Sequence, residues 1–279
     1  MATPTLPADL EQQVQRALAE DVGSGDLTSA LVPPERWARA QVVTREDGVL
    51  CGAPWFDAVF RALDRQVVVN WMHRDGARIK ADNLLCTLSG PARVLLTGER
   101  TALNFLQTLS GTATTARRHA DAVAGTRCTV LDTRKTLPGL RTAQKYAVAC
   151  GGCANHRMGL YDAVLIKENH VVAAGSIADA VRAARRAAPG ARLEVEVETL
   201  AELDEAIVAG VELVLLDDFS LEELRAAVVH SAGRARLEAS GGVSLDALAA
   251  IAATGVDFVS VGALTKHLHA LDLSLRFEA

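Results

Sequence analysis

The sequence predicts an α/β protein, with an N-terminal α+β sandwich domain and a C-terminal α/β barrel of six to seven strands. Short apolar runs, roughly 20 to 35 residues apart and separated by helical stretches, are typical of repeated βα units with parallel strands. They centre near Val130, Leu165, Val195, Leu215, Leu237 and Val259. The earlier part of the chain instead has alternating β-rich runs, which indicate an antiparallel or mixed sheet. The predicted domains are therefore 1–112, joined by a strand at 270–279, and 113–269.

The elements of the first domain follow from periodicity. Leu10, Val14 and Leu18 have helical spacing, whereas residues 271–277 alternate with period two and should return to the first domain's sheet. Residues 1–7 are expected to be a frayed tail. In order, the sequence predicts a helix over 10–20, strands within 38–51, a helix over 55–63, further strands within 66–97, a helix over 99–109, and a join at Gly111. In the barrel it predicts helices over 177–188, 200–209, 221–231 and 245–254.

Positive charge gathers around the first two barrel strands. Residues 131–170 hold six Lys or Arg residues together with His156 and His170, in a chain whose net charge is −5. Asp132, Arg134 and Lys135 follow the first strand, and Lys167 follows the second. Carboxyl ends of parallel strands are where α/β proteins bind ligands, so this cluster predicts an anion-binding site rather than a generally charged protein surface.

The third and fourth barrel strands deliver carboxylates. The run EVEVE at 194–198 puts three Glu side chains on one face of a strand, and the next strand ends at Asp217. Alternating Glu on an edge strand would be a solvated face, but a central barrel strand directs its upper carboxylates into the mouth. Glu196 and Asp217 are the predicted site residues, able to hold sugar hydroxyls or a hydrated Mg²⁺ ion.

Glycine-rich turns follow the last two strands. Ser240, Gly241 and Gly242 precede one helix, and Gly262 precedes another. Backbone N–H groups at such turns and helix N-termini form a phosphate cradle. No Ser-His-Asp order, HExxH or Walker A motif is present, so catalysis by positioning and charge is favoured over an activated nucleophile. A Schiff-base role for Lys167 is the alternative within this geometry.

Composition excludes several classes of function. A net charge of −5 and 4% aromatic residues argue against nucleic-acid and anionic-membrane partners. No apolar run reaches the ~18–20 residues of a membrane span, and no signal peptide is visible, so a cytoplasmic location is expected. The five cysteines suit reduced thiols. Cys150 and Cys153 form a CxxC motif, which a Gly-rich loop explains without a metal. His267 and His269 form a HxH motif, which a pair of surface histidines explains equally well.

Several motifs, in order and over nearly the whole chain, resemble those of the quinolinate phosphoribosyltransferases, decarboxylating enzymes of NAD synthesis. They are EDVGSGDLT at 20–28, ERTALN at 99–104, DTRKT at 132–136, NHR at 155–157, IKENH at 166–170, EVEVE at 194–198, LDDF at 216–219 and ASGG at 239–242. Two departures stand out: Cys153 replaces a third glycine before the NHR segment, and Asp218 replaces the usual Asn.

The resemblance implies a reaction of quinolinate with 5-phosphoribosyl-1-pyrophosphate that yields nicotinate mononucleotide, pyrophosphate and CO₂, with Mg²⁺ as cofactor. It implies a homodimer with shared active sites, in which Arg100 reaches the neighbouring subunit's substrate; further assembly is left open. The implied quinolinate residues are Arg100, Arg134, Lys135, His156, Arg157 and Lys167. The implied catalytic residues are Lys135, Lys167, Glu196 and Asp217. Glu196 and Asp217 would face ribose and metal, and Ser240, Gly241, Gly242 and Gly262 the ribose phosphate.

Four alternatives remain at this stage. A sister protein of molybdate-transport operons shares the scaffold, and a nicotinate phosphoribosyltransferase would need fewer cations. A barrel aldolase would use Lys167 as a Schiff base. A phosphate-binding module without turnover would use only the glycine cradle.

Overall fold

The computed structural model describes residues 4–278, so the expected frayed tail lies in part outside the described chain. The chain divides into two compact units: Met1–Arg117 with Thr136–Gly152 and Leu264–Ala279, and Arg118–Lys135 with Cys153–Ala263. Helix α4 (Arg141–Gly151), placed with the barrel on sequence grounds, groups with the first unit because it buries Ala143, Tyr146 and Ala147 in that unit's hydrophobic core. No helix in residues 4–278 is long and apolar enough to cross a membrane.

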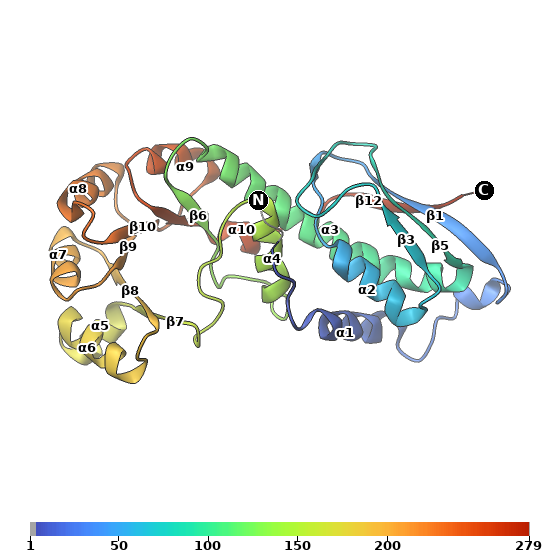
Figure 1. The fold of residues 1–279 in the computed structure, drawn as a ribbon, viewed down its shortest axis with the longest axis horizontal. Helices are drawn as coiled ribbons and strands as arrows, with labels where there is room; N and C mark the ends of the chain where they lie inside the picture. Colours follow the sequence, from blue (N-terminus) through green and yellow to red (C-terminus); the bar gives the residue numbers. More distant parts are fainter. Residues whose placement is uncertain (1–3, 279) are drawn as a thin grey trace. The chain divides into compact units, whose positions relative to one another are not determined.

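The first unit packs helices against a small antiparallel sheet. Its four strands lie in the order β12-β1-β5-β3, and Ala40 of β1 pairs with Phe277 of β12, which confirms the predicted return of the chain's end. Trp55 is fully buried and its indole N–H donates to Gln13 Oε1 at 2.8 Å, joining α2 to α1. The elements are α1 (Leu10–Val22), β1 (Trp37–Thr44), β2 (Gly48–Val49), α2 (Ala53–Leu63), β3 (Val68–Trp71), β4 (Arg78–Ile79), β5 (Leu84–Pro91), α3 (Ala92–Ala122) and β12 (Leu273–Phe277). Figure 1 shows α2 and α3 lying alongside the sheet.

Helix α3 is much longer than the sequence indicated. It runs for 31 residues, and Gly111, expected to end it, lies in its interior. A Cβ at Gly111 would lie 2.0 Å from the carbonyl oxygen of His269. The glycine is therefore explained by the close approach of a neighbouring backbone, and the expected join is wrong.

The second unit is a six-stranded parallel sheet in the order β6-β11-β10-β9-β8-β7, which confirms the predicted α/β class. In residues 4–278 the outer strands β6 and β7 are not hydrogen-bonded to each other, so the curved sheet stays open. In Figure 1, helices α6, α7 and α8 cover the outer side of the strands. The elements are β6 (Thr129–Leu131), β7 (Ala163–Ile166), α5 (Glu168–Ala174), α6 (Ile177–Ala187), β8 (Arg192–Val197), α7 (Leu200–Val208), β9 (Leu213–Asp217), α8 (Leu221–Ser231), β10 (Arg236–Ser240), α9 (Leu245–Ala252), β11 (Phe258–Ser260) and α10 (Ala263–Lys266).

Four of the helices begin with the same side-chain cap. The hydroxyls of Ser176, Thr199, Ser220 and Ser244 each accept a hydrogen bond from the backbone N–H three residues later. Such a cap satisfies one otherwise unpaired amide and stabilises a helix by about 1 kcal/mol. The caps at Thr199, Ser220 and Ser244 therefore fix the helix ends of the turns that follow β8, β9 and β10 at the carboxyl edge of the sheet.

Candidate active site

Five of the predicted site residues lie at the carboxyl ends of neighbouring strands. Lys167 follows β7, Glu196 is the penultimate residue of β8, Asp217 ends β9, Ser240 ends β10, and Gly262 follows β11 closely. Because these strands are parallel, their carboxyl ends share one edge of the sheet. The second unit therefore brings together the predicted acid, cation and glycine positions.

Lys167 and Glu196 form an ion pair at this edge. The Lys167 Nζ lies 2.5 Å from Glu196 Oε2, and the two side chains are 44% and 10% exposed. The register of β7 against β8 pairs Ile166 with Val195, so the next residues along each strand face each other. With the acid almost buried, the effective dielectric is lower than in water and the charges interact strongly.

The glycine turn after β10 has backbone angles that favour glycine. Gly241 has φ +99° and Gly242 has φ +50°. A Cβ on Gly241 would lie 1.9 Å from Asp218 Oδ1, and the backbone N–H of Asp218 donates to Ser240 at 3.1 Å. The Gly241 turn is thus fixed against the end of β9. Because its glycines carry no side chain, a ligand can approach the backbone of the turn closely.

The glycine after β11 makes room for a cation. A Cβ on Gly262 would lie 2.9 Å from Lys135 Cδ and 3.5 Å from Thr133 Oγ1. The Lys135 stem therefore passes close to the glycine. A larger residue at Gly262 would displace that cation.

Asp132, fully buried after β6, holds the NHR segment. Its Oδ2 accepts from the Asn155 amide at 2.7 Å, and its Oδ1 accepts from the backbone N–H of His156 at 2.9 Å. The bridge between Leu131 and Ala154 brings the two segments together. Asp132 therefore positions the segment that carries Arg157.

His156 points into the interior of the unit. Its Nε2 lies 2.8 Å from Glu194 Oε2 and 3.7 Å from Glu238 Oε1, and its Nδ1 accepts from the backbone N–H of Arg157 at 2.7 Å. Burial raises the pKa of Glu238 well above its usual value, and the neighbouring Glu194 charge raises it further. Two carboxyl groups thus share a dry site with one imidazole.

Arg134 and Arg157 are suited to bind an anion. The Arg134 Nε is buried and has no hydrogen-bond partner in residues 4–278. Burial lowers the pKa of Arg157, and the nearby Arg134 charge lowers it further. Two guanidinium groups that repel each other are stabilised by a carboxylate, which accepts bidentate hydrogen bonds from Arg.

Glu238 should give the protein a measurable pH dependence of stability. Unfolded Glu ionises near pH 4.5, whereas the folded group keeps its proton to higher pH. The folded state then binds more protons, so its stability falls as pH rises from about 4.5 through the folded pKa. We expect the free energy of unfolding of Glu238→Gln, measured in urea, to fall less than that of the wild type between about pH 5 and about pH 8. Parallel pH profiles would contradict the raised pKa.

Two protein-family descriptions match the chain. "Quinolinate phosphoribosyl transferase, N-terminal domain" matches residues 26–110, and the corresponding C-terminal domain matches residues 112–276. The chain belongs to the quinolinate phosphoribosyltransferase family.

Individual relatives support this. A nicotinate-nucleotide pyrophosphorylase (carboxylating) of Mycobacterium leprae is 46% identical over 272 residues, covering 94% of this chain and 95% of its own. A probable enzyme of the same name from Bacillus subtilis is 39% identical, covering 95% and 92%. The structure of the nicotinate-nucleotide pyrophosphorylase from Francisella tularensis has a TM-score of 0.96 at 44% identity, covering 100% of this chain and 99% of that one.

Not every residue expected from the family resemblance lies in the second unit. Arg100 lies on α3 in the first unit, where its side chain is exposed. The other predicted residues of this quinolinate phosphoribosyltransferase chain all belong to the second unit. They are Arg134, Lys135, His156, Arg157, Lys167, Glu196, Asp217, Ser240, Gly241, Gly242 and Gly262.

Three carboxyl groups at this edge of the sheet are buried: sequence reasoning placed Asp132 at a strand end and Glu194 on the strand face of Glu196, and it missed Glu238. Asp132 and Glu238 are 0% exposed and Glu194 is 2% exposed. A signal was available, because Glu194 shares a strand face with Glu196, and Glu238 interrupts an apolar strand between Leu237 and Ala239. A carboxylate in a buried strand needs a partner, and only the structure reveals His156 as that partner.

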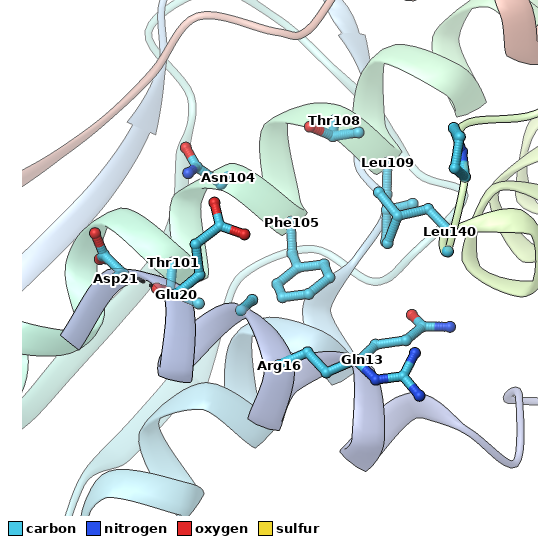
Figure 2. Close-up of a pocket in the computed structure, with 13 residues that line it drawn as sticks. Gln13, Arg16, Glu20, Asp21, Thr101, Asn104, Phe105, Thr108, Leu109 and Leu140 are labelled. Carbon is cyan, nitrogen blue, oxygen red and sulfur yellow. Dashed lines mark hydrogen bonds between the residues drawn. The ribbon is translucent and has the colours of Figure 1, made fainter. Parts of the chain in front are cut away.

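A cavity of about 390 Å³ lies in the first unit, between α1 and α3 (Figure 2). Phe105, Leu109 and Leu140 give it an apolar wall, whereas Arg16 and Glu20 bring charges of both signs to its edge. None of the predicted strand-end site residues lines it. A cavity of mixed charge does not suit a strongly anionic substrate as the cationic cluster does.

One cysteine of the CxxC motif, Cys150, has a structural explanation. Cys150 lies with Cys51 and Asp75, with all three ligand atoms within 4.8 Å. Asp75 accepts from the backbone N–H groups of Gly52 and Ala53 at 3.0 and 3.1 Å, which caps α2. Its carboxylate is thus already engaged, as expected for a structural role.

Proposed function

We propose that this protein transfers phosphoribose from 5-phosphoribosyl-1-pyrophosphate to quinolinate and releases CO₂, forming nicotinate mononucleotide and pyrophosphate. The observation that carries the proposal is the match of both family domains along residues 26–276, with every charged position of the expected site present. The relatives bear the name nicotinate-nucleotide pyrophosphorylase (carboxylating). The order of the two expected steps, bond formation at the ring nitrogen and then loss of CO₂, follows from the charge of the pyridine ring.

In the first step the pyridine nitrogen forms a bond to C1 of the ribose as the bond to pyrophosphate breaks. Positive charge develops on the ribose, where the carboxylates of Glu196 and Asp217 stabilise it. The glycine turns at Gly241 and Gly262 hold the 5-phosphate through backbone N–H groups. Lys135 and Lys167 offset the negative charge of the pyrophosphate and substrate carboxylates.

In the second step the carbon bond to the 2-carboxylate breaks and CO₂ leaves. The electron pair stays on the ring, which the new bond to nitrogen has made positive, and a proton then adds to that carbon. Arg134 and Arg157 hold the dicarboxylate in place and favour it over a monocarboxylate. Positioning and charge are the protein's whole contribution in this scheme.

The proposal extends to a magnesium ion, a homodimer and a cytoplasmic location. Glu196 and Asp217 on neighbouring strands supply the few carboxylate oxygens that Mg²⁺ uses alongside waters and phosphates. Bound there, Mg²⁺ would neutralise charge on the pyrophosphate. Arg100, exposed and outside the second unit, is the residue we propose for the partner subunit's site. Free thiols at Cys51, Cys86, Cys128 and Cys150 suit a reducing compartment.

The test is release of labelled CO₂ from quinolinate labelled in its 2-carboxyl group, in the presence of Mg²⁺. We expect release only when phosphoribosyl pyrophosphate is also present, and a loss of at least about 10²-fold in Arg134→Ala, because a bidentate anion contact is removed. No release from the folded wild-type protein would overturn the proposal. In that case tight binding of phosphate would favour the binding module, and a borohydride-trapped adduct at Lys167 would favour the aldolase.

A further inference from the structure

A cavity of about 570 Å³ lies in the second unit at the edge of the sheet opposite the candidate active site. Its lining includes the first residues of three neighbouring strands: Arg192 of β8, Leu213 of β9 and Arg236 of β10. Because these strands are parallel, they all begin at one edge and deliver the predicted site residues at the other. The volume falls within the range of about 300–1,000 Å³ of pockets that bind small molecules.

Positive charge dominates this amino-edge cavity. Arg185, Arg192 and Arg236 line it, and among the described residues of the lining Glu212 is the one acid. The arginines come from three different elements, α6, β8 and β10, so no local sequence pattern explains why they meet. Three guanidinium groups around one space repel one another, and a bound anion offsets that repulsion.

Two of these guanidinium groups are oriented by neutral partners. Arg185 Nη2 donates to the carbonyl oxygen of Gly210 at 2.7 Å, and the guanidinium carbon of Arg236 lies 5.5 Å from the centre of the Phe258 ring. Neither a carbonyl group nor a phenyl ring carries a net charge, so both contacts fix a side chain without neutralising it. Arginine also stays protonated throughout the physiological pH range, so these charges are permanent.

The two arginines at strand starts stand on the faces that carry buried carboxyl groups. Side chains alternate along a strand, so Arg192 shares a face of β8 with Glu194, and Arg236 shares a face of β10 with Glu238. Burial raises the pKa of Glu238, the neighbouring Glu194 charge raises it further, and the Arg192 charge acts in the opposite direction. A helix-capping role explains Arg185 at Gly210, but it does not explain these two.

The rest of the lining is mostly small and apolar. Ala184, Ala188 and Pro189 come from the end of α6 and the loop after it, and Val211 and Leu213 come from the chain that leads into β9. Arginine binds phosphate through paired N–H groups, whereas a small apolar surface suits the flat face of a ring. A ligand with both a ring and several phosphates matches both parts of the cavity.

We propose that the amino-edge cavity is a second ligand site and that it binds a nucleoside triphosphate, with the phosphates among Arg185, Arg192 and Arg236 and the base against the apolar residues of the lining. The site is distinct from the one proposed for phosphoribosyl pyrophosphate, because its residues lie at the other edge of the sheet. Binding there requires no turnover, so it does not depend on the proposed function.

Calorimetric titration of the full-length protein with ATP, without quinolinate or Mg²⁺, tests the site. We expect the dissociation constant to rise at least about tenfold in Arg192→Gln and in Arg236→Gln, because each change removes a charge-assisted contact to phosphate. Arg186→Gln, an exposed arginine next to Arg185 on α6 but outside the lining, is the matched control and should change the affinity less than about twofold. Lys167→Met, which removes a cation at the active-site edge, should also leave the affinity for ATP within about twofold.

Inorganic triphosphate distinguishes a nucleotide site from a simple anion site. We expect ATP to bind at least about fivefold more tightly, because only ATP has a base to bury against the apolar residues. Equal affinities would overturn the nucleotide assignment. No binding of ATP, equal losses in Arg186→Gln and Arg236→Gln, or a loss in Lys167→Met alone would overturn the proposed site. An absence of CO₂ release in the assay above would count against the proposed function and leave the ATP titrations to decide the cavity by themselves.

Discussion

We expect Lys167→Met to lower kcat/KM by about 10³-fold in the CO₂-release assay, the largest effect of any single charge removal. The substitution removes a cation that faces the anionic substrates and leaves Glu196, 10% exposed, without its partner at 2.5 Å. An almost buried carboxylate deprived of its cation is strongly unfavourable. It would then repel the substrate's own carboxylates.

The matched control is Lys80→Met. Lys80 Nζ lies 2.6 Å from Asp47 Oδ2, close to the geometry of the site pair, but the two side chains are 76% and 58% exposed. Solvent screens such pairs, which contribute about 0–1 kcal/mol, so activity should stay within about twofold of the wild type. Equal losses in both variants would show that general destabilisation, and not the strand-end pair, explains the effect of Lys167→Met.

We expect Gly241→Ala to abolish measurable phosphoribosyl pyrophosphate binding and to lower the free energy of unfolding by about 2–4 kcal/mol. Two causes add: alanine at φ +99° is strained, and its Cβ would lie 1.9 Å from Asp218 Oδ1. Moving Asp218 to relieve the overlap disturbs the turn that forms the phosphate cradle. Calorimetry and urea denaturation measure the two effects separately.

Gly242→Ala distinguishes strain from overlap. Gly242 has φ +50°, within the left-handed region that alanine tolerates at about 1 kcal/mol, and no atom lies within 4 Å of its added Cβ. We therefore expect a loss of about 1 kcal/mol in stability and a modest loss of affinity. If both variants lost affinity equally, the position of Asp218 would be irrelevant to the cradle.

The sequence was sufficient for the six strands of the second unit and for α6, α7, α8 and α9, because buried parallel strands and amphipathic helices have different periods. The short helices α5 and α10 were not predicted. It failed for α3, where the small polar residues after Gly111 have no apolar period of their own. What decides their helicity is contact with distant segments, such as Thr114 Oγ1 accepting from the backbone N–H of Val49 at 2.8 Å. Such tertiary contacts override local propensity.

The site shows the same division. The strand ends at Lys167, Glu196 and Asp217 could be predicted, because parallel strands end at one edge. The role of Glu194 could not, because the chain separates it from His156 by almost forty residues, and neither local pattern specifies the other. Residues that bind ligand follow from their place on the fold, whereas those that orient them follow only from packing.

Strand β12 covers one edge of β1 and comes from the last residues of the chain, with Ala40 paired to Phe277. During synthesis on the ribosome, β1 is made long before that partner emerges. One side of the nascent sheet then presents unpaired backbone amides and carbonyls, a template for association between unfinished chains. The pairing is thus a timing constraint, because β1 keeps an unpaired edge until residues 273–277 have been made.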